Sequence, residues 1–135
     1  MRKLKRLLRN DGGASALEFA LVLPVFAAMM FGTIQMGIAF YYAGSVQYAL
    51  ERTARLTMVE QDMSSGQVQT AFDNELSTFT DENIIVNYAV DDSGDVPIAQ
   101  FTAAYVHEFI IPFVPTFSIT FDAETRVPLE PAAAS

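Results

Sequence analysis

A long apolar run dominates the first third of the chain. From Phe19 to Ala43 the residues are apolar or small apart from Thr33 and Gln35. A helix rises about 1.5 Å per residue, so this run extends roughly 37 Å, more than the ~30 Å of hydrocarbon in a bilayer. The run therefore predicts a helix that crosses a membrane.

The helical pattern continues beyond the apolar run. Apolar or small residues recur there at steps of three and four, the spacing of one helix face. They are Val46, Ala49, Leu50, Thr53, Ala54 and Met58. We therefore predict a single segment over residues 14–60, a transmembrane helix that becomes an amphipathic stem.

A second, shorter helix is predicted over about residues 66–79. Ser64 and Gln67 have the spacing of a capping box, in which each residue satisfies a backbone donor near the helix start. The large apolar residues that follow share one helical face: Val68, Phe72, Leu76 and Phe79. Packing against a core is the role that this pattern indicates.

Three strands are predicted after this helix. Apolar and polar residues alternate over residues 83–90, 101–109 and 117–123, and Asp91–Asp95 reads as a turn. Short connections favour an antiparallel meander with one face covered by the two helices. The fold class is α+β, with a folded domain over residues 61–127 and a flexible tail over 128–135. Residues 98–121 are apolar too, but His107, Glu108, Pro112 and Pro115 make a second membrane span costly.

The charges are distributed unevenly. The chain has a net charge of −8, yet five of its eight basic residues precede Asp11, and residues 14–135 carry 15 acids against 3 bases. The basic end is expected to stay in the cytoplasm and the acidic remainder to be exported, with Tyr41 and Tyr42 at the far membrane interface. The acidic part lacks the basic clusters that phosphate binding needs, which excludes nucleic acid as a partner.

No residue pattern points to catalysis or a cofactor. The chain has no cysteine and one histidine, His107, and a strand places His107 and Glu108 on opposite faces. Asp91, Asp92 and Asp95 could hold a cation, but they lack the spacing of a calcium loop, and a solvated turn is the favoured interpretation. We expect no enzyme activity, no cofactor and no metal site.

Proline and glycines interrupt the apolar run. Pro24, Gly32 and Gly37 are poor helix formers in water, whereas a membrane helix tolerates them. The glycines lack GxxxG spacing, so filling and helix packing remain equally open as their roles. The predicted membrane helix includes Leu21, Pro24, Phe26, Phe31, Gly32, Gly37 and Tyr41.

The start of the run resembles a known processing site. A basic leader over residues 1–13 ends in Gly13, Ala14 follows, and the pair Glu18–Phe19 stands before the span. This order is similar to that of type IV pilins, and the stretch SALEFALVLPVFAAMMFGTIQMGIAFYYAGSVQYALERTAR resembles the TadE-like family of the tight-adherence (Flp) pilus system. The resemblance covers about residues 12–56. It implies a pilin-like fold and cleavage between Gly13 and Ala14 by a prepilin peptidase.

The resemblance to type IV pilins implies a role for Glu18 in docking between subunits. The pilin glutamate is thought to meet the new terminal amine of a neighbouring subunit, and such an ion pair would offset the cost of a carboxylate in lipid. Phe19 belongs to the same docking segment. The alternative is that Glu18 lies solvated among the headgroups without a partner.

The resemblance implies a minor pilin or pseudopilin in the bacterial inner membrane, with its C-terminal domain in the periplasm or in a surface pilus. Its expected partners are the prepilin peptidase, other pilin subunits and the membrane. One rival hypothesis is an uncleaved single-pass anchor carrying a periplasmic binding module. The other is a secreted enzyme or adhesin released by signal peptidase, although signal-peptide apolar regions are usually only ~7 to 15 residues long.

Overall fold

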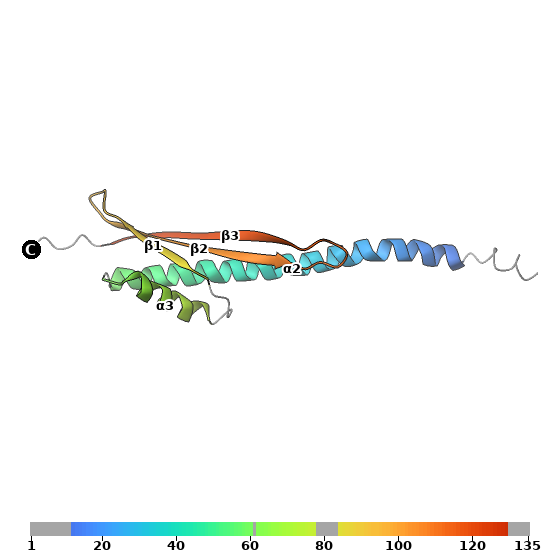
Figure 1. Cartoon of the computed structure of the whole chain (residues 1–135), viewed down its shortest axis with the longest axis horizontal. Helices are drawn as coiled ribbons and strands as arrows, with labels where there is room; N and C mark the ends of the chain where they lie inside the picture. Colours follow the sequence, from blue (N-terminus) through green and yellow to red (C-terminus); the bar gives the residue numbers. More distant parts are fainter. Residues whose placement is uncertain (1–11, 61, 78–83, 130–135) are drawn as a thin grey trace, which may run out of the picture. The chain divides into compact units, whose positions relative to one another are not determined.

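The chain is an α+β protein, as the sequence predicts (Figure 1). The computed structural model describes residues 12–60, 62–77 and 84–129. In this part of the chain the elements are α2 (Gly12–Val59), α3 (Ser65–Leu76), β1 (Val86–Asp91), β2 (Ile98–Phe109) and β3 (Phe117–Pro128). Most of the predicted leader, Phe79 and the end of the predicted tail lie outside the described residues.

The chain forms two compact units. The first contains the described residues up to Met36 together with Phe109–Phe117, and the second contains Gly37–Glu108 and the residues from Ser118 on. The first unit holds the apolar part of α2 and the connection between β2 and β3. The second unit holds the buried core.

The part of α2 in the second unit buries one face. Its buried residues recur at three- and four-residue steps and are Ala39, Ser45, Val46, Ala49, Leu50, Thr53, Ala54 and Thr57. The predicted stem face is confirmed except at its end, where Met58 is 44% exposed and Thr57 is 1% exposed. Thr57 stands seven residues, close to two helical turns, after Leu50, so the helix period brings Thr57 and not Met58 under the core.

Helix α3 begins at the predicted capping box. The Ser64 side chain accepts a hydrogen bond from the backbone N–H of Gln67 at 3.4 Å, and the backbone N–H of Ser64 donates to Oε1 of Gln67 at 2.9 Å. Val68, Phe72 and Leu76 are buried along one face of this helix. The helix is shorter than predicted and ends at Leu76, with the Ser77 N–H bonded to the Asp73 carbonyl.

The strands form a sheet in the order β1-β2-β3. β1 pairs antiparallel with β2, from Val86 opposite Ala103 to Asp91 opposite Ile98. β2 and β3 are also antiparallel. Ring contacts join β2 to β3 in this antiparallel arrangement. Phe109 stacks on Phe117, and Tyr105, four residues before Phe109, stacks on Phe121, four residues after Phe117.

The last two strands run further than the alternation predicts, whereas β1 begins at Val86, later than the predicted start at residue 83. β2 begins at Ile98 and β3 continues to Pro128. Leu129 is 8% exposed, and its N–H donates to the Pro97 carbonyl at 2.8 Å. The prediction of a flexible tail from residue 128 was therefore wrong for Pro128 and Leu129, because an apolar side chain and a backbone bond hold them in the domain.

One core joins the helices to the sheet in the second unit. Phe101, Ala103, Tyr105, His107 and Phe109 alternate along β2 and are all buried. The first three belong to a cluster with side chains of α2, α3 and β1, such as Leu50, Phe72 and Val86. The predicted covering of one sheet face by the stem and the second helix is confirmed.

A glutamine of α3 bonds the free edge of β1. Gln69 Nε2 donates to the Ile84 carbonyl at 2.8 Å, and Gln69 Oε1 accepts from the Val86 N–H at 2.8 Å. The side-chain amide thus takes the place of a neighbouring strand. This satisfies backbone groups that an open edge would leave unpaired.

Candidate processing and docking site

The predicted cleavage junction lies in the first turn of α2. The helix begins at Gly12, so Gly13 and Ala14 are both helical, and Gly13 is exposed. A glycine is about 1 kcal/mol less favourable than alanine in a helix. Consecutive Gly12 and Gly13 therefore lower the intrinsic helix propensity at the predicted junction.

Glu18 stands on the same helix, four residues after Ala14. Residues four apart face the same side, about 6 Å apart along the axis. Cleavage after Gly13 would create an ammonium group at Ala14, at the end of a helix where a carboxylate is favoured by the helix dipole. The exposed side chain of Glu18 is therefore placed to meet an amine, of its own chain or of another.

Most side chains of the apolar part of α2 are exposed. Phe19 is 64%, Leu21 69%, Phe26 62% and Phe31 41% exposed. Among the described residues, one helix stretch is long and apolar enough to cross a membrane, Ser15–Val59, and none of its most apolar 18-residue window, of mean hydropathy 2.0, is buried. Since a helix that is apolar all round needs an apolar surrounding, α2 fits a single-pass membrane protein.

Pro24 lies inside α2 without ending it. Its missing N–H leaves one helical carbonyl without its usual donor, a defect that membrane helices tolerate. The two glycines differ in their surroundings. A Cβ at Gly32 would lie 3.5 Å from Ile111 Cδ1, whereas a Cβ at Gly37 would meet nothing within 4 Å.

Aromatic side chains gather where the core begins. Tyr41 is 57% exposed and packs edge to face against Tyr42, whose ring lies 5.8 Å from that of Tyr105. An open cleft of about 400 Å³ adjoins Tyr41 and is lined by Phe40, Tyr41, Gly44, Ser45 and Tyr48. An aromatic residue of this kind suits the membrane interface, as the sequence predicts for Tyr41.

The acidic turn forms hydrogen bonds of its own. Asp91 Oδ1 accepts from the N–H of Ser93 at 3.0 Å and from its hydroxyl at 2.6 Å. These two bonds lower the pKa of Asp91. Burial, and then the charge of Asp92, raise the pKa of Tyr88 on the adjoining strand. In the described part of the chain, no three acidic, histidine or cysteine side chains are grouped to hold a metal ion.

His107 and Glu108 lie on opposite faces of β2. His107 is 8% exposed and its Nδ1 is 2.8 Å from the Tyr105 hydroxyl, while Glu108 is exposed. The strand period predicts this separation. The two side chains are not arranged as a catalytic pair.

Sequence reasoning missed one part of this region. The connection between β2 and β3 belongs to the same compact unit as the apolar part of α2. Gln35 Nε2 donates to the Ile110 carbonyl at 3.3 Å. Gln35 is a polar residue within an apolar run. Its presence there was the one feature of the sequence that indicated a polar contact at this position.

The apolar helix α2 and the α+β fold define a class of protein, in which a small α+β domain follows a long apolar helix. Residues 13–55 match the family model described as TadE-like protein. The match is consistent with a TadE-like protein of the tight-adherence system and confirms the resemblance. No curated protein and no solved structure matches the chain.

Proposed function

We propose that this protein is a minor pilin or pseudopilin that takes part in assembling a tight-adherence pilus. The observation that carries the proposal is the TadE-like match, which begins at Gly13 and continues along α2 to residue 55. The matched stretch holds the predicted junction, Glu18 and the whole apolar run. Its first residue is the one after which we expect a prepilin peptidase to cut.

The proposed route begins with membrane insertion. The basic residues before Asp11 keep the leader in the cytoplasm, α2 spans the inner membrane, and the acidic α+β domain enters the periplasm. The peptidase then removes residues 1–13. The exposed apolar side chains of α2 support this route, because they need lipid or other helices around them.

Glu18 is the proposed docking group. In a medium of low dielectric its carboxylate is costly until it meets a cation, so a neighbouring subunit's Ala14 amine would both neutralise it and set the axial register. Phe19 and the rest of the apolar helix provide the non-directional part of the contact. In this proposal the chain is a structural subunit and not an enzyme.

Replacing Glu18 tests the docking role. We expect Glu18→Ala and the isosteric Glu18→Gln to leave cleavage intact and to reduce pilus assembly at least tenfold, because both remove the charge. Glu51→Gln, a charge removal on the same helix within the folded domain, is the matched control and should assemble normally. Pili are counted by electron microscopy, and cleavage is followed by mass spectrometry.

Normal assembly by both Glu18 variants would contradict the docking role. If Glu18→Gln assembled and Glu18→Ala did not, side-chain size and not charge would be responsible, which also contradicts it. The rival hypothesis of an uncleaved anchor with a binding module predicts a retained leader in every variant.

A further inference from the structure

The connection between β2 and β3 carries large apolar side chains at its surface. Ile110 is 64%, Phe113 78% and Val114 40% exposed. No acidic or basic residue occurs from Phe109 to Phe121, in a chain that is otherwise acidic. We call residues 110–116 the hairpin tip. A loop in water usually carries polar residues at such positions, so the composition of this loop points to an apolar surrounding.

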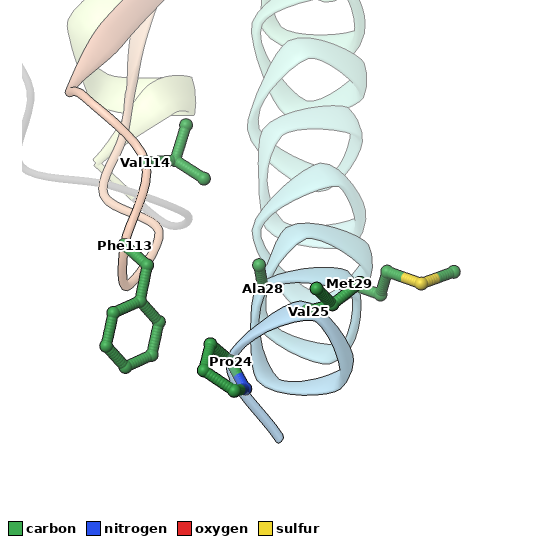
Figure 2. A pocket seen from close by; sticks show the side chains of 6 residues that line it. All are labelled: Pro24, Val25, Ala28, Met29, Phe113 and Val114. Atoms are coloured by element: carbon green, nitrogen blue, oxygen red, sulfur yellow. The ribbon is translucent and has the colours of Figure 1, made fainter. Parts of the chain in front are cut away.

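The hairpin tip contacts the apolar part of α2 within one compact unit. Gln35 bonds the Ile110 carbonyl, and Ile111 lies against Gly32. Between them is a cleft of about 410 Å³ lined by Pro24, Val25, Ala28 and Met29 of α2 and by Phe113 and Val114 of the hairpin tip. Figure 2 shows Val114 on the side of the hairpin tip that faces α2. Phe113 extends from the end of the tip, beside the part of α2 that contains Pro24.

The helix residues that line this cleft lie deep in the predicted span. If Glu18 marks the headgroup level, a hydrocarbon core of about 30 Å extends over about twenty residues from Phe19. Pro24 then lies about 8 Å and Met29 about 15 Å into that core. A loop packed beside these residues shares their surroundings.

Part of the backbone of the hairpin tip is hydrogen-bonded or lacks a donor. Pro112 and Pro115 have no N–H group, and the Val114 N–H donates to the Ile111 carbonyl at 3.2 Å. The Ile110 carbonyl accepts from Gln35. Phe113 has φ of 68°, an uncommon conformation for a bulky residue that forms the sharp turn at the end of the loop. Irregular backbone is tolerated at membrane depth where neighbouring protein satisfies it, and the bond from Gln35 of α2 contributes to this.

We propose that the hairpin tip is a second membrane-embedded element, which enters the hydrocarbon beside α2 without crossing it. Lipid acyl chains occupy the cleft and surround Phe113. All six lining side chains are apolar, so the cleft offers no hydrogen bond or charge that would select a protein partner. The proposal depends on the insertion of α2 in a membrane and not on a role in pilus assembly.

Tryptophan fluorescence tests this placement, because the chain contains no tryptophan of its own. The full-length Phe113→Trp variant is reconstituted into phosphatidylcholine vesicles, with and without bromine in the middle of the acyl chains. We expect a blue-shifted emission that brominated lipid quenches at least twofold. Ser93→Trp, in the exposed turn between β1 and β2, is the matched control and should be quenched little.

A third variant separates the possible failures. Phe26→Trp reports on α2 itself. If Phe26→Trp is quenched and Phe113→Trp is not, the proposal is wrong while the membrane helix stands, and if neither is quenched, both are wrong. Quenching of Phe113→Trp that is weak at high protein density and appears only when the protein is diluted in lipid would overturn the proposal in favour of contact with a second copy. Quenching that is independent of dilution supports it.

Discussion

A buried hydroxyl in the stem illustrates how single residues limit this fold. Thr53 is fully buried on the core face of α2, and within the described residues its Oγ1 has no hydrogen-bond partner. Thr57, one turn later on the same face, instead donates its hydroxyl to the Ala54 carbonyl at 2.7 Å. A buried polar group without a partner costs about 1 to 3 kcal/mol.

We therefore expect Thr53→Val to raise the free energy of unfolding by about 1 kcal/mol, because valine keeps the shape and removes the unpaired hydroxyl. Thr57→Val is the matched control and should leave stability unchanged or lower it by up to about 1.5 kcal/mol. Chemical unfolding of the full-length protein in detergent measures both. A destabilised Thr53→Val variant would show that the hydroxyl has a partner.

The role of Gln69 could not be predicted from helical or strand periodicity. The helical pattern places it beside the apolar face of α3, but only the structure shows its side-chain amide paired with the backbone at Ile84 and Val86. The ion pair of Arg52 with Glu75, 2.9 Å long, is another such contact. Both join residues far apart in the sequence, and periodicity reports only on contacts within one element.

Replacing Gln69 by alanine should lower the free energy of unfolding by about 1 to 3 kcal/mol, since it leaves a backbone donor and acceptor at the strand edge unpaired. The Val86 amide should also exchange its hydrogen faster. Gln100→Ala is the control, because the Gln100 side chain donates to the exposed Glu124 carboxylate and not to the backbone of the strand edge. Equal exchange at Val86 in wild type and Gln69→Ala would contradict the edge role.

At the scale of elements, periodicity predicted both helices and all three strands, but it was less accurate about where they end. The capping box placed the start of α3, and alternation identified the buried residues of β2. The ends differ because they depend on contacts from elsewhere, such as the bond from Leu129 to Pro97 that holds the end of β3. At the end of the stem, the burial of Thr57 in place of Met58 is a difference of the same size, one residue along the helix.

The hairpin tip is the element for which sequence reasoning was least complete. The prolines and the alternation correctly argued against a second spanning helix over residues 98–121, and β2 and β3 now occupy most of that range. The alternation did not indicate that the turn between them would lie against α2. That contact depends on Gln35 and Gly32, some 75 residues earlier in the chain.

At the scale of the whole molecule, the two compact units require different surroundings. The second unit buries its own core, whereas most apolar side chains of α2 in the first unit are exposed. A fold that leaves such a helix uncovered is complete only in lipid or among other helices. The TadE-like match over residues 13–55 connects this requirement to the tight-adherence pilus.

The intact mass of the protein extracted from cell membranes shows directly whether residues 1–13 are removed. We predict a chain that begins at Ala14 and keeps α2. Gly13→Leu should block this cleavage, whereas Gly37→Leu, a matched change where a side chain meets open space, should be cleaved normally. Functional protein that retains residues 1–13, or that has lost the whole apolar helix, would contradict the account.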